Sequence, residues 1–122
     1  MVNIDLNNQI WITRGDTGSF PLFLNAGNDL YPIRYEFQLE DEVYLGVMEP
    51  NQPFENAILK KKFTFNDLND DGDIVVKFKH DDTKCLLPGK YFYQIKAKFI
   101  NKETNEFEVH TVVQKTQFII EE

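Results

Sequence analysis

Residues 82–99, DTKCLLPGKYFYQIKAKF, decide the fold class because a turn leads directly into a long alternating strand. Pro88-Gly89 supplies the turn, and apolar and polar side chains alternate after it. The two faces of the strand carry different sets: Tyr91, Tyr93, Ile95, Ala97 and Phe99 on one, and mostly Lys90, Gln94, Lys96 and Lys98 on the other. Such alternation is typical of an antiparallel strand with one buried face. This stretch predicts an all-β domain and indicates no chemistry.

The same two-residue period recurs on both sides of this strand. Its apolar sets are Ile10 and Ile12; Phe20, Leu22 and Leu24; Leu59, Phe63 and Phe65; Ile74, Val76 and Phe78; Phe107, Val109, Thr111 and Val113. Turn residues separate the sets at 14–18, 27–29, 66–73 and 101–105. Seven to nine short strands are expected, at a spacing of roughly ten residues. We therefore expect one domain, residues 1–122, folded as an immunoglobulin-like antiparallel β-sandwich.

Several pairings follow from adjacency and from turn chemistry. Residues 59–65 and 74–78 are expected to form a hairpin across the acidic turn, and 107–113 is expected to pair with the strand before it. Pro21 argues for an edge position because proline cannot donate a backbone hydrogen bond. The apolar parity changes at Phe118 and Ile120, which predicts a bulge or bend near residues 114–117 and a last strand beyond it.

Two segments are less regular. Tyr35, Phe37 and Leu39 share a parity with Val43, Leu45 and Val47, so residues 35–48 form either one long strand or two that are interrupted at Glu40-Asp41-Glu42. Helical spacing is almost absent, and the one candidate is a short helical turn from Asp81 to Leu87 that an aspartate could cap and that Pro88-Gly89 would end.

Composition excludes some classes of function. Twenty acidic and thirteen basic residues give a net charge of −7, which disfavours binding to a phosphate backbone, so no nucleic-acid partner is expected. The start of the chain lacks a signal-peptide pattern and no run of about 18 apolar residues occurs, so synthesis in a cytoplasm and no membrane partner are expected. The single cysteine, Cys85, excludes an internal disulfide and a cysteine-based zinc cluster, and is expected to be a small buried hydrophobe.

The acidic turn is the strongest candidate for a metal site. Asp67, Asn69 and Asp71 place oxygen atoms at alternate positions before Gly72, as a calcium loop would. The glutamate that an EF-hand needs at its twelfth position is replaced by Phe78. A solvated hairpin, with a positive φ at Gly72, explains the same residues and is favoured, so no metal or other cofactor is predicted.

No catalytic group is predicted. His80 and His110 lack a nucleophile context and are expected at the surface or at an edge. Arg14-Gly15-Asp16 matches a tripeptide that integrins bind, but it falls at a turn and is explained by turn chemistry. In Lys60-Lys61-Lys62, alternation sends Lys61 to the opposite face from its neighbours, as on a solvated strand.

Four aromatic residues alternate out of phase with the apolar set that their own strand is expected to bury, so a single core between two sheets does not account for them. They are Trp11, Phe23, Tyr44 and Phe92. Each either belongs to a second buried face or contributes to a contact surface.

Short segments spread over the chain resemble a known family. They are Ile12-Thr13-Arg14-Gly15-Asp16-Thr17, Gly27 followed by Leu30, Val43 to Val47, Gly72-Asp73-Ile74, Asp82-Thr83, Leu87 to Ile95, Thr111-Val112-Val113 and Phe118-Ile119-Ile120-Glu121. In order and spacing they resemble the N-terminal domain of phage baseplate upper proteins and related small tail and head-decoration proteins.

The resemblance implies an immunoglobulin-like sandwich in a virion, without catalytic activity, that binds other virion proteins and self-associates. A tail or baseplate adaptor is expected first, and a head-fibre or capsid-decoration protein is the other virion role. The sequence ends directly after the last predicted strand, whereas the family continues into a receptor-binding region, so a host receptor is expected to be reached only through a partner. A calcium-dependent carbohydrate- or receptor-binding module is the alternative from another class.

Overall fold

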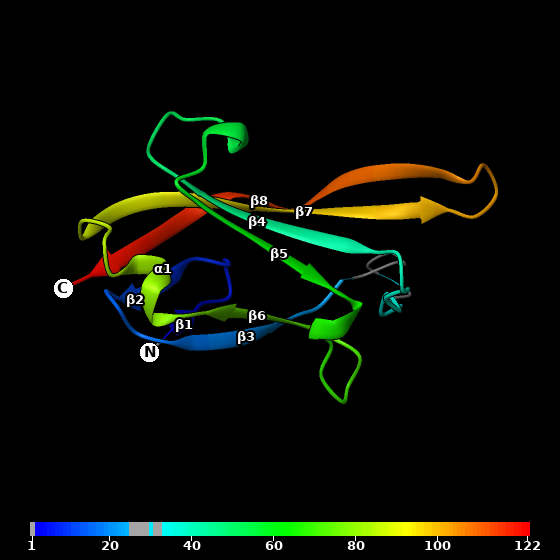
Figure 1. Cartoon of the computed structure of the whole chain (residues 1–122), viewed down its shortest axis with the longest axis horizontal. Helices are drawn as coiled ribbons and strands as arrows, with labels where there is room; N and C mark the ends of the chain where they lie inside the picture. Colours follow the sequence, from blue (N-terminus) through cyan, green and yellow to red (C-terminus); the bar gives the residue numbers. More distant parts are fainter. Residues whose placement is uncertain (1, 25–29, 31–32) are drawn as a thin grey trace.

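The computed structural model describes residues 2–24, 30 and 33–122, and these form two packed β-sheets (Figure 1). The strands are β1 (Val2–Ile4), β2 (Ile10–Thr13), β3 (Gly18–Leu22), β4 (Glu42–Met48), β5 (Leu59–Thr64), β6 (Ile74–Phe78), β7 (Gly89–Asn101) and β8 (Glu106–Glu121). The helical elements are η1 (Phe54–Asn56), η2 (Phe65–Asp67) and α1 (His80–Thr83). The prediction of an all-β sandwich is confirmed.

The larger sheet has six strands in the order β1-β2-β8-β7-β4-β5. β7 lies inside this sheet between β8 and β4, and it pairs antiparallel with β4, with Ile95 opposite Leu45 and Ala97 opposite Val43. The alternation predicted for β7 is present, since Tyr91, Tyr93, Ile95 and Ala97 are buried while the side chains between them are partly exposed. The strand that decided the fold class is thus a central strand of the sandwich.

In the described residues the smaller sheet consists of β3 and β6, which pair antiparallel with Phe20 opposite Val76. Since the sheet has two strands, β3 is an edge strand, as Pro21 predicted. The core lies between the two sheets and includes Ile10, Phe20, Leu22, Val43, Leu45, Phe63, Ile74, Val76, Phe78, Tyr93, Ile95, Phe118 and Ile120. Phe78 and Phe118 join the sheets, with their ring centroids 5.6 Å apart.

One predicted pairing is wrong, and one strand pair departs from the predicted antiparallel arrangement. β5 and β6 do not form a hairpin, because β5 pairs with β4 in the larger sheet and β6 pairs with β3 in the smaller one. The chain therefore crosses between sheets at the acidic turn, where only Leu68 and Ile74 form an isolated bridge. The sandwich is also not antiparallel throughout, since β2 pairs parallel with the end of β8, with Ile10 opposite Phe118.

Residues 35–39 are not a strand, so the apolar run is interrupted before Glu42. Asp41 explains the interruption: its buried carboxylate accepts hydrogen bonds from the Tyr35 hydroxyl at 2.5 Å and from the Gln38 backbone N–H at 2.8 Å. These contacts fold the segment into a compact turn in which Phe37 is still buried. The turn predicted at Gly27-Asn28-Asp29 lies outside the described residues.

β8 is one continuous strand with irregular pairing to β7. The register shifts between the pairs Tyr93–Thr116, Ile95–Val113 and Lys96–Thr111, so β8 carries extra residues near 112–115. The predicted bulge is confirmed, although it joins two halves of one strand. Beyond it, residues 98–101 and 106–109 form a two-stranded arm that extends past the rest of the sandwich (Figure 1).

The predicted helical turn is present as α1 (His80–Thr83), with Lys79 as its N-cap residue. The Asp82 carboxylate accepts the backbone N–H of Lys79 at 2.7 Å, so the capping aspartate lies inside the turn. Cys85 follows it and is exposed, which corrects the expectation of a buried cysteine. Leu86, its neighbour, packs against the core instead.

Candidate interaction surface

The face of the larger sheet that points away from the smaller sheet, here called the outer face, combines aromatic and lysine side chains. Along β2, β4, β5, β7 and β8, buried side chains alternate with side chains that point to the opposite side of the sheet. The second set forms the outer face. Its aromatic residues are Trp11, Tyr44, Phe54, Phe92 and Phe107, and its lysines are Lys60, Lys62, Lys90, Lys96, Lys98 and Lys115.

Four lysines lie over aromatic rings on this face. The distances from the ammonium to the ring centroid are 4.1 Å for Lys98 and Phe107, 4.8 Å for Lys96 and Phe54, 5.5 Å for Lys115 and Phe92, and 5.9 Å for Lys62 and Tyr44. Contacts of this kind are attractive because the ring face is electronegative. They fix flexible lysine side chains in place and leave apolar rings at a surface that water reaches.

Glu42 is the acidic centre of the outer face. Its carboxylate lies 2.5 Å from Lys62 and 3.8 Å from Lys98, and it accepts a hydrogen bond from the Tyr44 hydroxyl at 2.9 Å. The hydrogen bonds from Lys62 and Tyr44 hold the pKa of Glu42 below its usual value. Burial and the hydrogen bond to Glu42 raise the pKa of Tyr44. Glu42 is therefore ionised and Tyr44 protonated at neutral pH, and the Glu42 carboxylate lies between the ammonium groups of Lys62 and Lys98.

The loop between β4 and β5 covers part of the outer face. η1 places the Phe54 ring over Gly46, where a Cβ atom would lie 2.7 Å from Phe54 Cε2. A side chain at position 46 would push the ring away from the sheet. Gly46 therefore permits the close approach of Phe54 that brings it under Lys96.

The four aromatic residues singled out by parity separate into two places. Trp11, Tyr44 and Phe92 lie on the outer face and are partly exposed. Phe23, which is 64% exposed, follows β3 on the other side of the molecule and lies beside the Arg34 guanidinium. The sequence alternation thus indicated three aromatic residues of the outer face. It missed Phe54 and Phe107, because Phe54 reaches this face from the loop that contains η1 and Phe107 from the arm.

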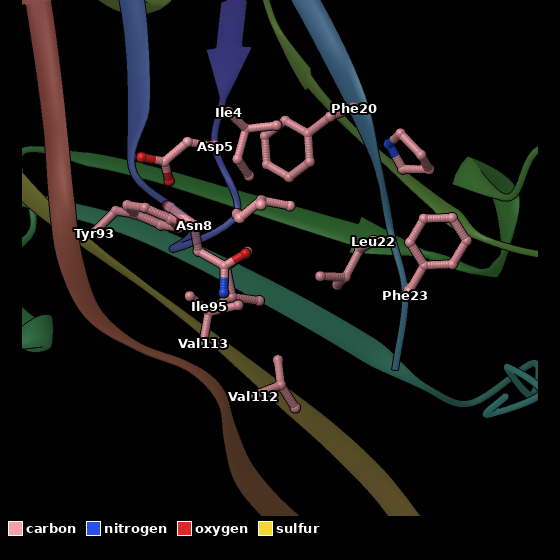
Figure 2. A pocket seen from close by; sticks show the side chains of 12 residues that line it. Ile4, Asp5, Asn8, Phe20, Leu22, Phe23, Tyr93, Ile95, Val112 and Val113 are labelled. Atoms are coloured by element: carbon pink, nitrogen blue, oxygen red, sulfur yellow. The ribbon is translucent and has the colours of Figure 1, made fainter. Parts of the chain in front are cut away.

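A pocket of about 470 Å³ opens between β3 and the bulged part of β8 (Figure 2). It is lined mainly by apolar side chains, including Ile4, Phe20, Leu22, Ile95 and Val113 (Figure 2). Asp5 and Asn8, at its polar side, belong to the loop between β1 and β2. The Asp5 carboxylate accepts the backbone N–H groups of Asn7 and Gln9, so it is used to hold that loop.

Tyr93 closes the floor of this pocket. Its hydroxyl donates a hydrogen bond to the Asn8 carbonyl, and burial followed by the charge of Asp5 raises its pKa well above the usual value. The hydroxyl is therefore protonated at neutral pH and has a structural partner. Among the other described residues that line the pocket, Asp5 and Asn8 are the polar ones, and both have structural roles in the loop between β1 and β2.

The acidic turn is organised by its own side chains. Asp67 accepts the Thr64 backbone N–H at 2.8 Å, and Asn69 Oδ1 accepts the N–H groups of Asp71 at 2.9 Å and Asp73 at 3.0 Å. Gly72 has a φ of +83°, as predicted. Asp73 is buried and paired with Arg34. Within the described ranges no group of three or more acidic, histidine or cysteine side chains could hold a metal ion.

The remaining candidates lie at turns and on exposed strands. Gly15 has a φ of +82°, and its N–H donates to the buried hydroxyl of Thr83 at 2.9 Å. His80 Nδ1 lies 2.7 Å from the Gly15 carbonyl, so the Arg14-Gly15-Asp16 turn is fastened to α1. His110 is exposed on the arm, 3.5 Å from Glu108. The two histidines thus lie at separate, exposed places, as predicted.

Lys60 and Lys62 lie on the outer face, and Lys61 points to the opposite side, as alternation predicted. In the part of the chain that is described, no helix has the length and apolar character needed to cross a bilayer. The chain matches no protein-family model, no curated protein sequence and no solved structure.

Proposed function

We propose that this chain is a non-catalytic structural protein of a phage virion that works through protein–protein contacts, most simply as a tail or baseplate adaptor. The single observation that carries the contact function is the outer face. There, partly exposed aromatic rings and lysines are held in fixed pairs on a rigid sheet. Aromatic residues are enriched at protein interfaces, and fixed side chains lose little entropy when a partner binds.

The outer face differs in charge from the rest of the molecule. The outer face carries six lysines and one central glutamate, Glu42, whereas the whole chain has a net charge of −7. The remainder of the molecule is therefore strongly acidic. A partner of the outer face is expected to present acidic and apolar groups, because charge complementarity steers association and selects the partner.

The strand order supports an immunoglobulin-like fold. β8-β7-β4-β5 in one sheet and β3-β6 in the other correspond to strands G-F-C-C′ and B-E of variable-type immunoglobulin domains. The disulfide of antibody domains has no counterpart, since the chain has one cysteine. Sandwiches of this architecture serve many functions, so the fold alone supports a binding module and nothing narrower.

The virion assignment rests on the sequence resemblance to baseplate upper and decoration proteins. Other virion proteins are its proposed partners, with copies of itself among them, and a host receptor would be reached through a partner. The calcium-dependent alternative gains no support from the acidic turn, because Asp67 and Asn69 already accept backbone hydrogen bonds there.

The test is analysis of purified phage particles from the phage that encodes the chain. Mass spectrometry should recover it at a fixed copy number, and lysine-directed cross-linking should join Lys62, Lys96 or Lys98 to other virion proteins. Lys77, exposed on the smaller sheet, is the matched control and should cross-link less. Absence of the chain from purified particles would contradict the proposal.

A further inference from the structure

β8 has a long free edge. β2 pairs only with its end, from Phe118 to Glu121, and β7 pairs along its other side. From Glu106 to Gln117 the edge away from β7 has no partner strand among the described residues. The first part of this edge, residues 106–109, belongs to the arm that projects beyond the sandwich (Figure 1). It therefore offers a row of backbone N–H and C=O groups at an accessible place.

Two of the other free edges, those of β5 and β3, carry features that discourage strand pairing. β5 has Lys60, Lys61 and Lys62 in succession, and β3 has Pro21. Lysines and prolines on edges oppose the addition of another strand. Residues 106–114, EFEVHTVVQ, contain neither. The edge of the arm is therefore left open to pairing.

We propose that this edge pairs with the same edge of a second copy, antiparallel and with Val109 at the two-fold axis. The inference rests on the proposed function only in taking the chain to act through protein contacts. A symmetric antiparallel pair of identical strands buries the same surface on both subunits. It would join the larger sheets of the two copies into one continuous sheet.

The side chains select this register. With Val109 opposite Val109 of the second copy, Phe107 lies opposite Thr111, and Glu108 lies opposite His110 on the other face of the arm. An imidazole N–H can donate to a carboxylate, and opposite partners in a cross-strand pair stabilise a sheet. Centring one residue earlier would set Glu108 against Glu108, and one residue later His110 against His110. Of these three registers, only the one centred on Val109 brings the glutamate opposite the histidine.

Exposure of apolar side chains points to the same place. Val109 is 65% exposed and Phe107 54% exposed in the single chain. A two-stranded ribbon is only marginally stable by itself, and a third and fourth strand would cover its edge and bring these side chains together. The pairing would thus give the free edge of the arm a partner strand and cover its exposed apolar side chains.

Charge substitutions test the contact. Wild-type protein should be a dimer by light scattering and sedimentation. His110→Glu places glutamates opposite one another twice, and Val109→Lys places two lysines at the axis, so each should weaken the dimer about tenfold. Adding Glu108→Lys to His110→Glu restores opposite charges and should restore the dimer. Leu87→Lys, an exposed apolar position away from the arm, is the matched control and should leave the dimer unchanged.

Cysteine cross-linking tests the register, in a Cys85→Ser background that removes the exposed natural thiol. Val109→Cys should form a disulfide-linked dimer on mild oxidation, because the two side chains meet at the axis. Phe107→Cys alone should not, since its opposite neighbour is Thr111, whereas Phe107→Cys combined with Thr111→Cys should. Far-UV circular dichroism confirms that each variant is folded.

Two results would overturn the inference: a wild-type monomer at all accessible concentrations, or a dimer that withstands both Val109→Lys and His110→Glu. Neither result touches the proposed function, because a monomer can still be recovered from virions and cross-linked through its outer face. Conversely, the protein could form the dimer with the predicted register and yet be absent from purified particles. That result would contradict the virion role and support the interface.

Discussion

The Lys61 ammonium lies 2.5 Å from the Asp82 carboxylate and links β5 of the larger sheet to α1, which follows β6 of the smaller one. Both side chains are mostly buried, at 13% and 16% exposure. The same ammonium lies 5.9 Å from the centre of the Phe78 ring, and Asp82 also caps the backbone of Lys79. One ion pair therefore ties the larger sheet to the segment that carries the chain back to it from β6.

Asp82→Ala is expected to lower the free energy of unfolding by about 2 kcal/mol, because it leaves a mostly buried ammonium unpaired and removes a helix cap. Urea unfolding followed by circular dichroism measures the change. The control is Asp81→Ala on the same turn, whose pair with Lys84 is exposed and which should have little effect. Equal losses from the two variants would contradict the linking role of Lys61.

Gly46→Ala is expected to destabilise the protein by about 1–3 kcal/mol, since the added methyl group overlaps the Phe54 ring. The loop that carries η1 should move off the sheet, and Lys96 should lose its aromatic partner. A double-mutant cycle with Phe54→Ala checks the cause by thermal unfolding. The cost of Gly46→Ala should shrink when the ring is absent; an unchanged cost would place the strain elsewhere.

Stability should decrease in alkaline solution. Burial raises the pKa of Tyr93 and of Tyr35 in the folded protein, and Asp41 raises that of Tyr35 further. The folded state thus keeps protons that the unfolded state releases above about pH 10, so stability is complete below that pH and is lost as the pH rises through the folded pKa values.

Tyr93→Phe should reduce this alkaline loss, while costing about 1 kcal/mol at neutral pH through the hydrogen bond to Asn8. Urea unfolding at several pH values, with absorbance titration of the phenolates, measures both effects. If the folded protein released all its tyrosine protons near the pH of free tyrosine, the burial argument would be wrong.

Asn69→Ala is expected to destabilise the acidic turn by about 1–2 kcal/mol, because its side-chain oxygen satisfies two backbone N–H groups. Calcium and a chelator should leave the melting temperature of the wild-type protein unchanged, since Asp67 Oδ2 and Asn69 Oδ1 already accept backbone hydrogen bonds. If calcium raised the melting temperature of the wild-type protein but not that of Asn69→Ala, the calcium-binding hypothesis for this turn would be supported.

Sequence periodicity predicted β7, β2, β3 and β6 because each buries one face against a single core, which is the condition under which alternation is informative. It could not assign partners. The same alternating pattern in residues 59–65 and 74–78 suits a hairpin and a change of sheets equally well, and the choice depends on Phe78 meeting Phe118 across the core.

Local polar contacts account for the other differences. Tyr35 and Phe37 have strand-like parity, but the buried Asp41 bends their segment by bonds that parity does not reveal. Cys85 is exposed because the chain after α1 places Leu86 inward instead. The outer face was indicated by Trp11, Tyr44 and Phe92, whereas Phe54 and Phe107 became part of it only through the η1 loop and the arm.

The parallel pairing of Ile10 with Phe118 has a consequence for folding. The two residues are separated by most of the chain, and contacts of such high sequence separation slow folding because a long loop must close first. During synthesis, β2 can pair with β1, but it stays without its second partner until β8 has left the ribosome. We therefore expect the sandwich to assemble in one late, cooperative step, and not progressively as the strands emerge.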